Sequence, residues 1–152
     1  MIRRITIATL GVVFALGLAG IAKAGSAYTK GDIFLGVDHV GVNEYTPTGT
    51  FVQTINGGGL TGYVTGMAFQ NNGDLLVTDF STGNVAQYDN SGTLINSTWA
   101  SGLHTPESIA INSSGDVYVS NVGSGGITEF ASSGGSPIGQ SISGTRTDWI
   151  DL

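Results

Sequence analysis

Four polar side chains are the strongest candidates for chemistry in this sequence, because each stands beside a short apolar segment at a recurring position. Asp79 and Asn121 each end such a segment, and His104 and Glu107 lie in the loop before the next one. If these segments are antiparallel strands of one repeated unit, the four residues emerge on a common face. Ca²⁺ accepts carboxylate and carbonyl oxygens at flexible geometry. We therefore predict ligand binding by Glu107, His104, Asp79 and Asn121, with Glu107, Asp79 and Asn121 as the candidate metal ligands.

The same residues also have a structural interpretation that needs no ligand. A short Asp or Asn side chain at the end of a strand commonly accepts hydrogen bonds from backbone N–H groups in a tight reversal. His104 and His39 fall in different parts of the repeat, which disfavours a metal site built from two histidines. Glu107 differs because its counterpart in the preceding repeat is Thr65, so the repeat itself requires no carboxylate there.

Covalent catalysis has no support in the sequence. Ser108, Ser113 and Ser120 are strand or turn residues, and no histidine recurs at a fixed distance from them. The glycine runs at 57–59 and 123–126 lack the lysine and the helix of a phosphate-binding loop. We therefore assign no catalytic residue and expect the chain not to be an enzyme on its own.

An internal repeat determines the fold. Residues 66–92 hold short apolar strands separated by turns rich in Asn, Asp and Gly, and the same order recurs at 106–134. Gly31, Gly73 and Gly115 occupy the same turn, which gives a period of about 42 residues. That period is typical of four-stranded propeller blades. The sequence thus predicts an all-β partial β-propeller of about three four-stranded blades, preceded by a signal peptide.

The N-terminal segment is typical of an export signal. Arg3 and Arg4 precede an uncharged apolar run from residue 5 to about 21, and residues 22–24 supply the small side chains that a signal peptidase requires. We predict a signal peptide at 1–24, a secreted or periplasmic protein, and no stable membrane insertion after cleavage. An uncleaved membrane anchor is the alternative.

Composition limits the partners of the exported domain. The chain has no cysteine, so in an oxidising compartment its stability must come from packing rather than disulfides. The five Lys and Arg residues against eleven Asp and Glu give a net charge of −6. Nucleic acids and anionic membranes bind basic surfaces, so we expect neither as a partner.

The repeats resemble those of NHL-type β-propellers. Residues 66–92 and 106–134 share with that family an apolar strand, an Asn/Ser-x-Gly-Asp turn, a Val-Tyr-Val-like strand ending in Asp or Asn, and a last strand closed by Tyr or Phe. Propellers of this kind are loosely similar to gluconolactonase-like and streptogramin-lyase-like enzymes. In the gluconolactonase-like enzymes, acidic and Asn residues of channel-lining strands bind a divalent metal, and the resemblance implies the same option here. Their full ligand set requires more blades than this sequence has.

The repeat predicts the domain boundaries. We expect the region 25–152 to hold blade one at 31–59, blade two at 64–101, blade three at 106–142, and the first strand of a further blade at 148–152. Closed propellers have four to eight blades, so about three do not make a ring. Either the sequence is the front of a longer propeller, or two copies form a homodimer that closes a ring, with 149–152 completing blade one.

Together these patterns favour an exported β-propeller that acts as a binding or interaction scaffold for an unidentified protein or small molecule. A fragment of a metal-dependent lactonase or lyase is the first alternative, and a self-assembling cell-surface subunit is the second. No cofactor is required by the sequence, with Ca²⁺ as the one option.

Overall fold

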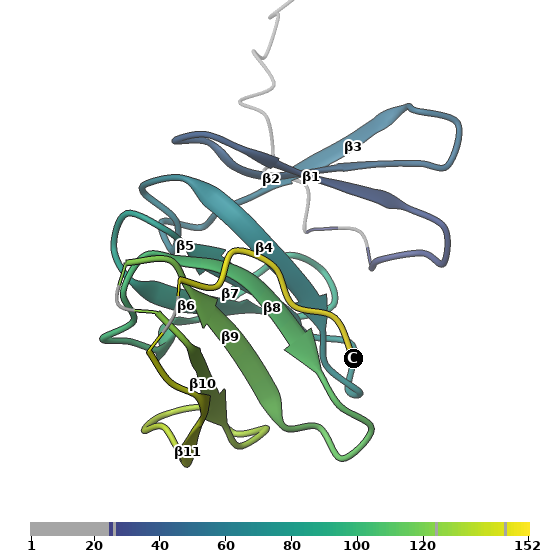
Figure 1. The fold of residues 1–152 in the computed structure, drawn as a ribbon. Coiled ribbons are helices and arrows are strands. Elements are labelled where there is room, and N and C mark those ends of the chain that lie inside the picture. The colour runs from purple at the N-terminus through teal and green to yellow at the C-terminus, as the bar shows by residue number, and fades with distance from the viewer. Residues whose placement is uncertain (1–24, 26, 124, 145) are drawn as a thin grey trace, which may run out of the picture.

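The computed structural model describes residues 25, 27–123, 125–144 and 146–152, and within them the chain folds into strands and turns without helix (Figure 1). The predicted signal peptide at 1–24 lies outside the described residues. The strands form three antiparallel sheets. Sheet A holds β1 (Ile33–Val37), β2 (Gly41–Tyr45) and β3 (Phe51–Ile55); sheet B holds β4 (Val64–Phe69), β5 (Leu75–Asp79), β6 (Asn84–Tyr88) and β7 (Leu94–Ala100); sheet C holds β8 (Pro106–Ile111), β9 (Val117–Asn121), β10 (Ile127–Phe130) and β11 (Gly139–Ile142). The described part contains no helix that could serve as a membrane span.

Each sheet is a simple meander in which consecutive strands are neighbours, as the repeat predicts for propeller blades. The repeated glycine of the first turn has a positive φ in every copy, of 101°, 91° and 92° at Gly31, Gly73 and Gly115. A residue with a Cβ rarely adopts this conformation, which explains why glycine marks the repeat. The expected all-β partial propeller is therefore confirmed.

Sheet A differs from the other two because it has three strands rather than four. Ile33, the first residue of β1, lies 42 positions before Leu75, the first residue of β5, and Leu75 lies 42 before Val117 in β9. The first strand of sheet A is thus equivalent to the second strand of sheets B and C. Within the described residues, sheet A contains no counterpart of the first strands β4 and β8.

Two apolar layers hold the three sheets together. Successive residues of a strand point to opposite faces of its sheet. All residues of β5 are buried, so both faces of this strand are covered. Leu75 and Val77 pack in the layer between sheets A and B, with Val42 and Ile55 of sheet A. Leu76 packs in the layer between sheets B and C. The latter layer is made by Leu76, Val85, Trp99, Ala100, Leu103, Ile109, Val117, Val119 and Phe130.

The end of the chain returns to sheet C. The segment 147–152, yellow in Figure 1, runs beside β8 and is not itself a hydrogen-bonded strand. Ile150 N donates to Ser108 Oγ at 3.2 Å, and Ser108 Oγ lies 3.4 Å from Ile150 O. Ser108 itself lies beside Gly66 of β4, 42 residues earlier. The segment therefore lies where the first strand of a next sheet would lie, with Ile150 equivalent to Ser108.

Candidate functional site

The Asp79 carboxylate is fully occupied by the protein backbone. Its side chain is 1% exposed and ends β5 at the predicted tight reversal. One oxygen, Oδ2, accepts hydrogen bonds from Thr61 N at 2.8 Å and Gly62 N at 3.1 Å. The other, Oδ1, accepts from Ser81 N at 3.0 Å and Thr82 N at 3.1 Å. One side chain thus fastens the loop before β4 to the loop after β5.

Asn121 has the equivalent position in sheet C and a similar role. Its Oδ1 accepts from His104 N at 3.0 Å, and its Nδ2 donates to Thr128 Oγ1 at 3.0 Å and to Val119 O at 3.3 Å. The side chain is 3% exposed. In both sheets, the last residue of the second strand holds the loop that leads into the first strand. This is the role that the structural interpretation gives to Asp79 and Asn121.

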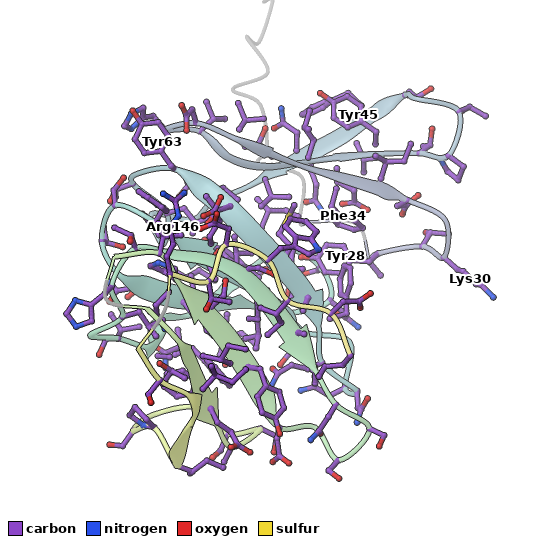
Figure 2. All side chains as sticks on the ribbon, viewed as in Figure 1. Tyr28, Lys30, Phe34, Tyr45, Tyr63 and Arg146 are labelled. Carbon is purple, nitrogen blue, oxygen red and sulfur yellow. The ribbon has the colours of Figure 1, made fainter. Side chains whose placement is uncertain are left out.

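His104 and Glu107 remain accessible. His104 is exposed beside a shallow pocket of about 460 Å³ that Asn121 also lines. Glu107 is half-buried in β8, and its carboxylate helps to raise the pKa of Arg146, although hydrogen bonding to Asp148 is the larger cause. Arg146 Nε donates to Asp148 Oδ1 at 2.6 Å, and the arginine lies near the end of the chain (Figure 2).

The four candidates thus share one end of the sheets without forming a cluster of free ligands. Among the described residues, no group of three or more His, Asp or Glu side chains could hold a metal ion. Asp79 has both carboxylate oxygens bonded to backbone donors, and Asn121 has its carbonyl oxygen bonded to His104 N. A metal at this face would have to displace the hydrogen bonds that fix these loops.

Two buried hydroxyls form a feature that the sequence analysis missed. The first strands β4 and β8 are irregular between residues 64 and 67 and between 106 and 109. In β4, Gly66 N donates to Thr78 Oγ1 at 2.6 Å, and in β8, Ser108 N donates to Ser120 Oγ at 3.0 Å. Thr78 and Ser120 lie one residue before Asp79 and Asn121, so the recurring hydroxyl was visible in the repeat although its partner was not.

The outer face of sheet A is a second feature of the structure. Ile33, Leu35 and Phe51 are 50%, 52% and 53% exposed. Phe34 and Val42 point the other way, into the layer shared with sheet B. Tyr45 lies on the same outer face, with its ring centroid 5.7 Å from that of Phe51. Sheet A therefore presents an apolar face that no described residue of another sheet covers.

The layer between sheets A and B contains polar groups that lack partners. Glu44 of β2 is 1% exposed and its Oε1 has no hydrogen-bond partner among the described residues, nor does the buried hydroxyl of Tyr28. Burial, followed by the Asp32 carboxyl, raises the pKa of Glu44 against the opposing effect of a hydrogen bond from Gln53. Burial likewise raises the pKa of Tyr28.

Comparison with known proteins supports the fold and leaves the activity open. No protein-family model matches the chain, and no curated protein matches it. A solved structure described as a proposed gluconolactonase is similar, with a TM-score of 0.55 and 16% sequence identity over 70% of this chain. The chain spans 36% of that protein's length. At this identity the likeness indicates a propeller-like fold and does not single out the NHL type.

Proposed function

We propose that this chain is a β-propeller interaction scaffold that binds its partner through an open sheet face. The observation that supports this is the contrast between equivalent residues of sheets A and B. Leu75 and Val77 are fully buried against sheet A, whereas Ile33 and Leu35, which occupy the same positions one repeat earlier, are about half exposed. An apolar sheet face of this kind is a typical interaction surface.

The partner that fits the outer face of sheet A is another propeller sheet. Sheet B packs on sheet A through the face that carries the first and third residues of β5. The face of sheet A in this contact is the one that carries Phe34, the second residue of β1. Sheet C offers such an opposite face, because Val117 and Val119 point into the layer with sheet B and Tyr118 points away from it. Ile142, 51% exposed on the neighbouring edge strand, extends this face. A second copy of the chain therefore supplies a matching surface.

Sedimentation of two charged variants tests this proposal. Leu35→Glu alters the outer face of sheet A, and Ile142→Glu alters the outer face of sheet C. Each should turn a self-associating protein into a monomer at micromolar concentration, because burying an unpaired carboxylate in an apolar contact is costly. Mixed together, the two variants should form a heterodimer, since each retains the face that the other has lost.

Ile95→Glu is the matched control, because Ile95 is 53% exposed on the outer strand of sheet B. It should associate like the unaltered chain. A discrete dimer indicates closure by two contacts, and a concentration-dependent polymer indicates the self-assembling surface subunit. If the unaltered chain stays monomeric at high micromolar concentration, a second copy of the chain is not the partner.

A fragment of a metal-dependent lactonase is the second candidate, favoured by the similarity to the proposed gluconolactonase. If Glu107 contributes to a Ca²⁺ site, millimolar Ca²⁺ should raise the melting temperature of the unaltered chain but not of Glu107→Gln, because an ion that binds the folded state stabilises it. No Ca²⁺ effect on melting, together with no lactone turnover, would eliminate this candidate.

A further inference from the structure

A pocket of about 480 Å³ opens where the segment before β1 meets the turns of sheet B. Its lining includes Tyr28, Asp32, Phe34 and Phe69, together with the turn glycines Gly31 and Gly73. Phe34 and the exposed Leu35 are neighbours along β1, so they point to opposite faces of sheet A. The pocket is therefore separate from the outer face that we propose for self-association.

Three aromatic rings from two parts of the chain form one wall of this pocket. The ring centroids of Tyr28 and Phe34 lie 5.1 Å apart, and Phe69 lies 5.0 Å and 5.5 Å from these two rings, each pair edge to face. Phe69 ends β4 and is 45% exposed, so part of this wall is open to a ligand. The face of an aromatic ring carries partial negative charge, and such rings attract cations.

A buried carboxyl lies on the same side of sheet A as this wall. Glu44 pairs with Phe34 across β2 and β1, so both side chains point to the same face. Glu44 is 1% exposed; Gln53 Nε2 donates to its Oε2 at 2.6 Å, whereas Oε1 has no hydrogen-bond partner among the described residues. The Tyr28 hydroxyl is likewise buried without a partner. Two unpartnered oxygen atoms thus accompany the aromatic wall.

The charges around the pocket favour a positive ligand. Lys30 and Arg146 are the lysine and arginine residues that follow residue 24, against eleven Asp and Glu. Arg146 Nε donates to Asp148 at 2.6 Å, and the Lys30 side chain extends away from the protein into solvent (Figure 2). The pocket itself contains Asp32. A buried carboxylate such as Glu44 is costly without a counter-charge, which a bound cation supplies.

We propose that this pocket binds a quaternary ammonium cation, such as the trimethylammonium group of choline. The rings of Tyr28, Phe34 and Phe69 receive the methyl groups, and Asp32 and Glu44 supply the opposite charge. Glu44 acts from behind the rings through its charge, without contact with the cation. A quaternary nitrogen carries no N–H, so it requires no acceptor at an aromatic wall. The volume of the pocket lies in the range of about 300–1,000 Å³ that is typical of small-molecule sites.

NMR titrations with choline and with its uncharged carbon analogue, in which a tert-butyl group replaces the trimethylammonium group, test this proposal. The two molecules have the same shape and differ in charge. Choline should bind at least about fivefold more tightly than the analogue. Equal affinities would overturn the proposal, because they would indicate an apolar pocket that does not select charge. An absence of choline binding at a concentration on the order of 10 mM would also overturn it.

Two variants locate the site. Phe69→Leu removes a ring and keeps an apolar side chain at an accessible position, so it should abolish the preference for choline over the analogue. Glu44→Gln removes the buried charge and keeps the shape of the side chain, so it should weaken choline at least about threefold and leave the analogue unchanged. The matched control is Phe51→Leu, which removes a ring 53% exposed on the outer face of sheet A and should bind choline like the unaltered chain. Full choline binding by Phe69→Leu would contradict the proposed site.

A final comparison separates this proposal from self-association and identifies the source of the cation. Leu35→Glu alters the opposite face of sheet A, so it should bind choline like the unaltered chain whether or not the chain associates. Vesicles of phosphatidylcholine provide the second arm. Their binding by the unaltered chain and not by Phe69→Leu would identify a lipid headgroup as the ligand, whereas binding of free choline alone would identify a soluble cation.

Discussion

Asp79 fixes two loops with a single carboxylate that accepts four backbone hydrogen bonds. We expect Asp79→Ala to lower the free energy of unfolding by about 2–4 kcal/mol, because it leaves backbone donors without an acceptor in a buried position. Asp79→Asn, which keeps one acceptor oxygen, should lose about half as much. Denaturant unfolding measures both values.

Asp38→Ala provides the comparison at an exposed carboxylate in the turn after β1, and its effect should lie within about 0.5 kcal/mol. A loss of similar size for Asp79→Ala would show that the loops do not depend on this side chain.

At the scale of single residues, the sequence predicted where a side chain lies in the fold better than it predicted the hydrogen-bond partners of that side chain. The repeat placed Asp79 and Asn121 at strand ends, where a backbone-bonding role is the ordinary expectation. It did not reveal that Asp79 reaches Thr61 and Gly62, because those donors precede it by 18 and 17 residues in a loop that belongs to no motif.

At the scale of elements, the turn that follows β10 brings two successive glycines against sheet B. Gly134 and Gly135 both have positive φ, of 74° and 90°. A Cβ on Gly134 would lie 2.5 Å from Trp99 O and 2.6 Å from the Trp99 ring, whereas a Cβ on Gly135 would have no atom within 4 Å. The pair therefore separates backbone strain from steric conflict.

We expect Gly135→Ala to cost about 1 kcal/mol, which is the conformational penalty alone. Gly134→Ala should cost roughly 1–3 kcal/mol more, because Trp99 is buried between sheets B and C and cannot move freely. Chemical denaturation of the two variants measures the difference. Equal losses would mean that the turn shifts as a unit and that the contact with Trp99 is not a constraint.

The strands themselves were largely predictable, because Asn, Asp and Gly turns mark their ends. Strand β6 ends at the turn of residues 89–92, and β7 extends from Leu94 to Ala100, well beyond the short apolar segment that follows this turn. Its register with β6 is interrupted, and Trp99 and Ala100 are buried near its end. Local polar residues at 96–98 concealed this continuation. The segment 148–152 lies beside sheet C without strand pairing.

At the scale of the whole molecule, the three sheets are packed unequally. Sheet B is covered on both faces, by sheet A through one apolar layer and by sheet C through the other. Sheet A is covered on one face, and its first strand leaves Ile33 and Leu35 exposed. The length of the repeat predicted this stack of blades, but the sequence could not show which face would remain open.

This asymmetry predicts a gradient of amide hydrogen exchange. Backbone amides of β5 and β6 should open only with global unfolding, because both faces of their sheet are buried. Those of β1 and β3 should exchange at least about tenfold faster in dilute solution, since sheet A can detach by disrupting one apolar layer. Exchange followed by mass spectrometry of peptic fragments measures both sets in the same sample.

Concentration supplies the decisive comparison. If a second copy covers the outer face of sheet A, protection of β1 should rise with protein concentration, while protection of β5 changes little because its environment is already closed. In Leu35→Glu the concentration dependence should disappear. Uniform protection across all three sheets in dilute solution would contradict the gradient. It would mean that sheet A, with one covered face, is held as firmly as sheet B, with two.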